Sequence, residues 1–362
     1  MRQGFYKFLI LFIGFLFILL SLPGEETESS NPAEKIFGKN FNLTVDPTSG
    51  TLSYYFSEQT NELQSILAEK NVRLISDRMN LECEKLAFNT KTNKVKASGS
   101  PIKITQDKIS AICGEFSYDP ESGRSELLSS PQIITYDEGG NRIVTKGDRI
   151  FIEKQEAGDT MILVEGKARL SSHEDEDTSP SLNSKNLMEN AMLGKQFDII
   201  TGNQGEILYR FSTGNRLNSI VARNDVSVSS EQLDLHCNRL EFNDEKKILV
   251  ASGKPVKILQ QSLSAECGRL EYYTEQKKYL LLEDPIIINQ DQEGGRIETR
   301  GDRIIILQTE GSGTSILVEG NPQFVAQAAQ KQKTAKKKKN KSLSPVDESN
   351  VEKIKNLDIV KD

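Results

Sequence analysis

The chain has 362 residues with 46 basic and 52 acidic side chains, a net charge of −6, so its length allows two domains of ordinary size. Residues 331–362 hold 10 lysines and 5 acidic residues, which leaves 36 basic against 47 acidic residues in the rest of the chain. A body with this acidic excess repels nucleic-acid phosphates, and we therefore exclude nucleic acid as a partner.

Residues 1–24 have the pattern of a signal peptide or a membrane anchor. Arg2 and Lys7 precede an apolar run from Phe8 to Leu22, and glutamates follow it from Glu25 onward. Basic residues before the run and acidic residues after it predict that the body is exported from the cytoplasm. The run is long for a signal-peptide core and short for a membrane span, so the sequence leaves open whether it is cleaved.

Residues 83–166 recur as residues 237–320 with a constant offset of 154 residues. The shared landmarks of the first copy are Cys83, Gly99, Cys113, Pro131, the GDR of residues 147–149 and the LVEG of residues 163–166. We therefore predict two tandem modules, residues 36–170 and 193–326. An acidic linker, residues 171–192, joins them, and a Lys-rich tail, residues 327–362, follows.

Each module repeats a pattern of the form apolar-x-small-x-x-apolar-x-apolar. It covers residues 81–88, 111–118 and 145–152, and it returns 154 residues later. Alternation at period two is typical of half-buried strands, and the wider spacing after the small residue predicts a bulge or corner. A fixed short period predicts stacked strands with a continuous core. The expected fold class is all-β, with an N-terminal hydrophobic helix and a disordered basic tail.

These repeats resemble the OstA-like family, the LptA-type periplasmic bridge proteins of lipopolysaccharide transport, and the N-terminal segment resembles an LptC-like anchor. The match runs through residues 81–104, 111–134 and 147–170 and their partners in the second module. The motif is degenerate, so its specificity comes from repetition. The chain departs from the family in having cysteine at an alanine position, a doubled module and the Lys-rich tail.

The resemblance implies two tandem open β-jellyrolls in the periplasm, free or anchored in the inner membrane by residues 8–22. It implies a non-catalytic carrier that passes lipopolysaccharide, or a related acylated glycolipid, from the inner to the outer membrane. The implied partners are the inner-membrane transporter and the outer-membrane translocon of the Lpt system. The open sheet edges at the ends of a stack separately predict docking to membrane components or head-to-tail self-association. Burying a twelve-carbon acyl chain is worth about 9 kcal/mol, which is why such a lipid needs shielding from water.

The candidate groove residues are the apolar members of the repeats. In the first module they are Ile66, Val72, Leu74, Leu81, Leu86, Phe88, Ile102, Ile104, Phe116, Tyr118, Ile134, Ile150, Ile152, Ile162 and Val164. In the second they are Ile220, Val226, Val228, Leu235, Leu240, Phe242, Val256, Ile258, Leu270, Tyr272, Ile288, Ile304, Ile306, Ile316 and Val318. The same residues would also suit a solid core, so a structural or adhesive solenoid with a closed interior and no ligand is the alternative function.

The four cysteines form two pairs with a spacing of 30 residues, Cys83 with Cys113 and Cys237 with Cys267. If the two cysteines of a pair lie on directly stacked repeats, they are within disulfide reach. Otherwise they are free buried thiols. We expect no metal site, because the spacings differ from those of zinc ligands and the only histidines are His173 and His236. The sequence has no nucleophilic triad and no phosphate loop, so we expect neither an enzyme nor a cofactor.

Overall fold

The computed structural model describes Phe37 and residues 40–59, 63–77, 79–137, 140–155, 158–173, 196–230, 234–260, 263–290, 295–309 and 313–327. The predicted N-terminal helix lies outside these residues, as do most of the linker and nearly all of the basic tail. Within them, no helix has the length and apolar character needed to span a membrane.

The described residues form 24 strands joined in one antiparallel sheet, which confirms the all-β class. The first twelve are β1 (Phe41–Thr44), β2 (Thr51–Phe56), β3 (Leu63–Ser76), β4 (Asn80–Asn89), β5 (Lys94–Gln106), β6 (Ile109–Asp119), β7 (Arg124–Leu128), β8 (Gln132–Tyr136), β9 (Arg142–Lys146), β10 (Arg149–Lys154), β11 (Thr160–Glu165) and β12 (Arg169–His173). The others are β13 (Phe197–Ile200), β14 (Glu206–Phe211), β15 (Leu217–Ser230), β16 (Asp234–Asn243), β17 (Ile248–Gln260), β18 (Leu263–Tyr273), β19 (Lys278–Leu282), β20 (Ile286–Gln290), β21 (Arg296–Arg300), β22 (Arg303–Thr309), β23 (Gly313–Glu319) and β24 (Gln323–Gln327).

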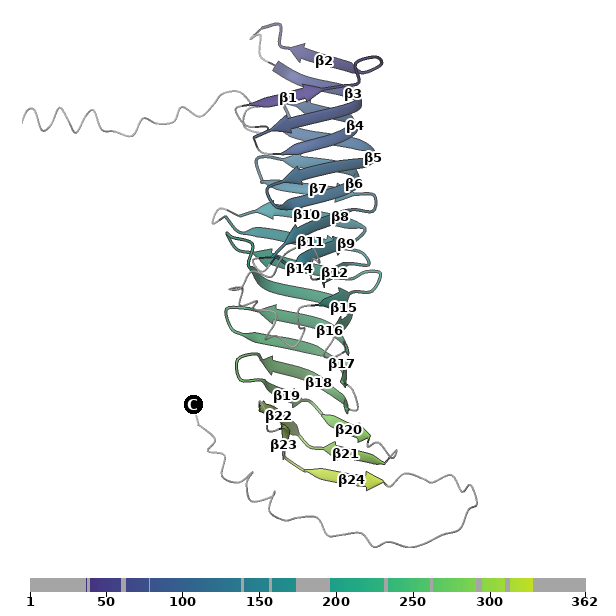
Figure 1. Cartoon of the computed structure of the whole chain (residues 1–362), viewed down its shortest axis with the longest axis vertical. Helices are drawn as coiled ribbons and strands as arrows, with labels where there is room; N and C mark the ends of the chain where they lie inside the picture. The colour runs from purple at the N-terminus through teal and green to yellow at the C-terminus, as the bar shows by residue number, and fades with distance from the viewer. Residues whose placement is uncertain are drawn as a thin grey trace, which may run out of the picture.

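The duplication of the sequence is a duplication of strands. Strands β3 to β9 recur as β15 to β21 with both ends of every strand displaced by 154 residues. The two modules are continuous, because β11 pairs with β14 and β12 pairs with β13. Figure 1 shows the result as one long column of stacked strands.

The sheet folds into two lanes that face each other. Lane A consists of β2, β7, β10, β11, β14, β19, β22 and β23, and lane B consists of β1, β8, β9, β12, β13, β20, β21 and β24. The eight long strands, β3–β6 and β15–β18, run through both lanes. Each lane is therefore sixteen strands high, roughly 70 Å at the usual strand spacing.

The long strands cross between the lanes at a line of bends, which we call the apex. Register shifts mark it between Glu69 and Val72 in β3 and between Ser98 and Ile102 in β5. Lys70 and Asn71 have positive φ there, and the Ser100-Pro101 peptide bond is cis. A further register shift, between Glu82 and Lys85 in β4, lies at the bulge predicted after Cys83.

The repeated GDR and VEG motifs build the apex corners between the short strands. The Asp148 amide donates to the carbonyls of Glu165 and Gly166 at 2.9 and 3.0 Å, and Asp302 repeats this with Glu319 and Gly320. Gly147 has no room for a side chain, because a Cβ there would lie 2.5 Å from a methyl of Val164. The motifs are therefore conserved between the modules for backbone geometry.

The core lies between the two lanes and runs through both modules. Of the thirty candidate groove residues, 24 are buried in it. Tyr118, Ile152 and Val318 are partly buried against it, and Ile316 is 37% exposed at the last strand of lane A. The choice of Ile134 and Ile288 is wrong: their neighbours Ile133 and Ile287 point inward, so they lie half-buried on the outer face.

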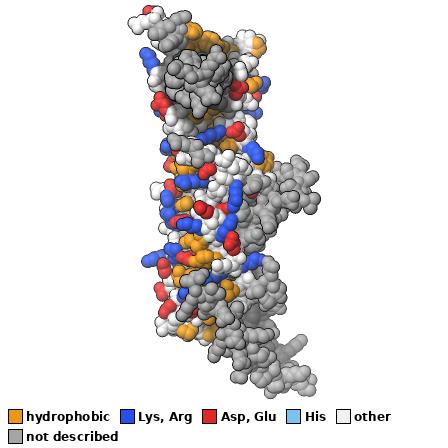
Figure 2. All heavy atoms as spheres, turned by 90° about the vertical axis from the view of Figure 1, so that its left-hand side faces the viewer, with side chains coloured by type: hydrophobic (Ala, Val, Ile, Leu, Met, Phe, Trp, Pro, Cys, Tyr) orange, Lys and Arg blue, Asp and Glu red, His pale blue; other side chains and the backbone are white. Residues whose placement is uncertain are grey.

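Several surface charges of the column are paired across neighbouring strands. Figure 2 shows acidic and basic side chains interspersed on one face, with hydrophobic side chains between them. An example is Arg149, which lies 3.4 Å from Glu126 and 3.7 Å from Glu165. Such exposed pairs contribute little to stability, about 0–1 kcal/mol each, so the fold depends on its interior.

Candidate functional site

The side of the column opposite the apex is a seam between the two lanes, which we call the mouth. The hairpin turns of lane A form one lip, for example residues 90–93 and 212–216, and those of lane B form the other, for example residues 107–108. In the described residues every ladder pairing stays within one lane, so no backbone ladder joins the lips. The apolar interior is separated from water along this seam by side chains.

Polar contacts cross the mouth from lane A to lane B. Lys154 Nζ, at the end of β10, lies 3.0 Å from Asp107 Oδ2 in the turn between β5 and β6. Asn215 Nδ2, in the turn after β14, donates to the Tyr136 carbonyl of β8 at 3.3 Å. We call the Lys154–Asp107 pair the clasp; both side chains are largely exposed, so it is a weak bond.

The interior behind the mouth is closed in the described residues. The side chains nearest the apex, such as Val72, Leu74 and Leu270, are at most 1% exposed. Phe37 packs edge-on against Phe88, with ring centroids 5.7 Å apart, and covers the N-terminal end of the core. The open groove that the family resemblance implied is therefore not present in this structure; the two lanes pack directly against each other.

A polar contact lies inside this core at the junction of the modules. Thr145 Oγ1 and the Tyr209 hydroxyl are 2.6 Å apart, and both residues are fully buried. Burial raises the pKa of Tyr209 above its ordinary value, so this phenol is neutral at any physiological pH. Sequence reasoning missed this pair, because Tyr209 and Thr145 come from different modules.

A small cleft opens the mouth in the second module. Its volume is about 60 Å³, and its lining is Ile258, Gln260, Leu263 and Ala265 from lane B and Tyr279, Leu281, Ile306, Gln308 and Thr314 from lane A. The Tyr279 hydroxyl is hydrogen-bonded to Tyr272 and Gln308 at its edge. Only Ile258 and Ile306 of this lining were among the candidate groove residues.

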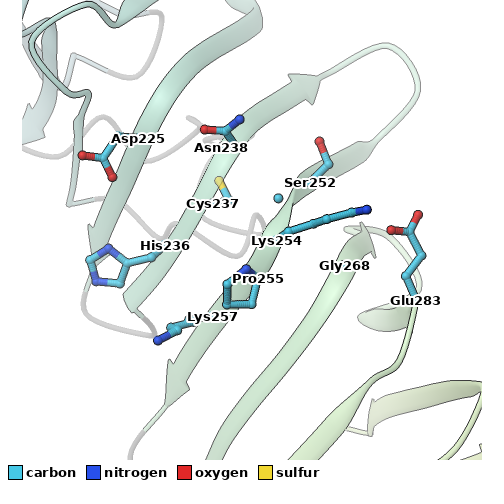
Figure 3. Close-up of a pocket in the computed structure, with 11 residues that line it drawn as sticks. Asp225, His236, Cys237, Asn238, Ser252, Lys254, Pro255, Lys257, Gly268 and Glu283 are labelled. Atoms are coloured by element: carbon cyan, nitrogen blue, oxygen red, sulfur yellow. The ribbon is translucent and has the colours of Figure 1, made fainter.

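A larger hollow lies on the outer side of the apex in the second module. It measures about 660 Å³, and its walls carry Asp225, His236, Lys254, Lys257 and Glu283 (Figure 3). His236 Nδ1 is 2.9 Å from the Ser227 hydroxyl. Because the lining carries charged side chains and faces away from the core, this hollow does not suit a hydrocarbon chain. In the described part of the chain no three metal-ligating side chains come together.

The cysteines lie at the apex, and all four are free and buried. The pairing of Cys83 with Cys113 is not formed, because Cys83 is on β4, Cys113 is on β6 and β5 lies between them. Strands two apart are separated by about 9.5 Å, beyond the roughly 7 Å that a disulfide spans. Cys237 and Cys267 are separated by β17 in the same way. Burial raises the pKa of each thiol to about 12, so none is a thiolate nucleophile at neutral pH.

Comparison with known proteins finds weak similarity among solved structures. No family model matches the chain, and no curated protein matches it. Among solved structures, part of the chain is similar to the crystal structure of LptH, the LptA-homologous periplasmic component of the lipopolysaccharide transport device from Pseudomonas aeruginosa. The identity is 18%, the match covers 28% of this chain and 85% of that one, and the TM-score is 0.22. A similarity of this size carries no argument about function.

Proposed function

We propose that this protein is a non-catalytic periplasmic carrier that shields the acyl chains of lipopolysaccharide, or of a related acylated glycolipid, between its two lanes. One observation carries the proposal: an apolar core continues through both modules, and along the mouth no backbone ladder closes it in the described residues. The lips can therefore part by a hinge at the apex without breaking a strand pairing. The family resemblance of the repeats agrees with this reading.

The energetics require the opening to be local. Exposing one buried Leu, Ile or Phe side chain costs about 1.5–3 kcal/mol, and burying a twelve-carbon chain returns about 9 kcal/mol. One acyl chain thus offsets the separation of about three to six large side chains. Because the described core holds 24 of the candidate residues, a whole-length opening would cost far more than one chain returns. We propose that the lanes part over a few strands at a time as a chain moves along the column.

The alternative is a structural column with a solid core and no ligand. The closed interior of the described residues favours it, since an acyl chain does not fit without movement. The two functions differ in whether lipid ever reaches the core.

The test is photo-crosslinking of lipopolysaccharide to the full-length protein. A crosslinking residue at Tyr118 or Tyr272 faces the core beside the mouth, and we expect it to capture the lipid. Matched controls at the outward-facing Lys94 and Lys246 should give no adduct. Adducts at the controls alone would favour the structural column without a ligand. The same conclusion would follow if mass spectrometry found no lipid in the purified protein.

The ends of the column support the proposed stacking with partners or with a second copy. On the side that continues the core, the N-terminal edge exposes Tyr54 and Phe56, and the C-terminal edge exposes Phe324. Unpaired strand edges with exposed apolar side chains are suited to strand addition. We propose that such stacking continues the apolar core from one unit to the next.

A further inference from the structure

The two modules differ at the mouth although they share the same strands. The first module has the clasp, Lys154 with Asp107. In the second module the counterpart of Lys154 is Gln308, and the sequence has Gln261 at the counterpart of Asp107. Two neutral amides cannot form an ion pair, so the second module lacks this bond.

The mouth cleft lies at the place where the clasp is missing. Gln308 forms part of its rim, and the facing walls are Ile258 and Leu263 in lane B and Tyr279 and Ile306 in lane A. At the counterpart of Tyr279 the first module has Ser125. The ring of Tyr279 packs against that of Tyr272 with centroids 4.4 Å apart, so an aromatic ring lines one wall of this mouth.

The side chains that line the cleft suit the binding of an acyl group. Its floor is apolar, and its rim carries the uncharged Gln260, Gln308 and Thr314. Amides and hydroxyls both donate and accept hydrogen bonds, which suits an ester or amide linkage above a hydrocarbon chain. None of the lining residues is charged, so the cleft does not select for a phosphate or an ammonium head group.

The size of the cleft makes it a place of first contact. A volume of about 60 Å³ is that of about two water molecules at liquid density, and it is well below the ~150 Å³ apolar cavity that holds benzene. Only the end of a chain fits before the lips move. A chain end inserted there would act as a wedge between Ile258 and Ile306.

We infer that the mouth of the second module is the port where an acyl chain is first inserted, while the clasp holds the mouth of the first module shut. The inference rests on the proposed carrier function and specifies its site and its ligand chemistry, a hydrocarbon chain beneath an uncharged ester or amide. From the port the chain moves along the column or into a stacked partner.

Time-resolved crosslinking of the full-length protein tests the port. A photo-crosslinker replaces Leu263 at the second mouth or its counterpart Ile109 at the first, both partly buried side chains. Purified lipopolysaccharide is mixed with each variant and the sample is flashed at increasing times. We expect adducts at Leu263 to form at least several times faster than those at Ile109.

The outcomes separate the port from the carrier. Adducts at Ile109 that form as fast as those at Leu263, or faster, overturn the port and leave the carrier function standing. Adducts at neither position at any time overturn both.

The substitution Lys154→Gln copies the second module into the first and tests the clasp directly. An exposed ion pair of this kind biases an equilibrium by at most about fivefold. We therefore expect Lys154→Gln to speed capture at Ile109 by roughly twofold to fivefold and to leave capture at Leu263 unchanged. The matched control is Lys94→Gln, which removes a 3.5 Å ion pair with Asp119 within one lip. An equal effect of the control would contradict a role for the clasp.

Discussion

The last strands of the two modules correspond in sequence but differ in burial. In the first module, Ile162 on β11 and Leu170 on β12 are fully buried, because β14 and β13 of the next module cover them. Their counterparts Ile316 and Phe324 lie at the C-terminal edge and are 37% and 69% exposed. The pattern of a strand decides which side chains face inward, and the next strand decides whether they are buried. A module of this kind is complete only when another unit stacks on it.

The largest expected difference between the covered last strands of the first module and the uncovered last strands of the second is the free-energy cost of removing a core side chain. Ile162→Ala should lower the free energy of unfolding by about 2–5 kcal/mol, since it leaves a cavity in a packed interior. Ile316→Ala removes a side chain that is already partly in water and should cost less than about 1.5 kcal/mol. Urea denaturation of the two variants measures both values. Equal losses would mean that the C-terminal edge is covered in solution.

The exposed edges predict concentration-dependent stacking. In strand register, Tyr54 and Phe56 of β2 hold the positions of Tyr209 and Phe211 of β14. The latter two side chains are buried at the junction of the modules. We expect Phe324→Lys to weaken self-association at least tenfold, because it places a charge in an apolar contact. Light scattering over a concentration series measures this. The matched control is Val325→Lys on the opposite face of β24; a protein that stays monomeric without any substitution would contradict the stacking.

A smaller difference is expected at the buried hydroxyl pair. Thr145→Val leaves the Tyr209 hydroxyl without its partner in the core and should cost about 1–3 kcal/mol. Thr299 is the counterpart of Thr145 in the uncovered module and is only half-buried, so Thr299→Val should be close to neutral. Thermal unfolding of both variants gives the comparison. Combining Thr145→Val with Tyr209→Phe should recover part of the loss, since no unpaired hydroxyl then remains.

The smallest difference between the two modules is expected at the apex, where both carry buried cysteines at equivalent positions. All four thiols have a pKa raised by burial to about 12 from an ordinary value of 9. The folded state therefore binds these protons more tightly than the unfolded state, and stability should be complete below pH 9 and fall as the pH rises towards 12. Iodoacetamide at pH 8 should modify all four cysteines equally slowly until urea unfolds the protein. Fast modification of one pair would show that one apex opens separately.

Much of this architecture is predictable because corners have strict residue requirements. The positions of Gly147 and Gly301 mark the apex, and the alternation between corners marks the strands. The alternation becomes ambiguous where two apolar residues adjoin, and for that reason the inward Ile133 could not be distinguished from the outward Ile134.

Other features depend on the distance between elements, which a repeat does not specify. A period of 30 residues spans two strands, so Cys83 and Cys113 are second neighbours in the sheet rather than first neighbours. The alternation also specifies which side chains face the other lane but not how far away that lane lies. The closed interior, the clasp and the covering of the core by Phe37 are therefore findings of the structure.

The exact repetition of strand bounds has a consequence for reach. Each further copy of the module would add eight strands to each lane and lengthen the column by roughly 38 Å, without changing its cross-section. Gene duplication in such a fold changes the distance between two attachment points in fixed increments. It leaves the attachment surfaces themselves unchanged.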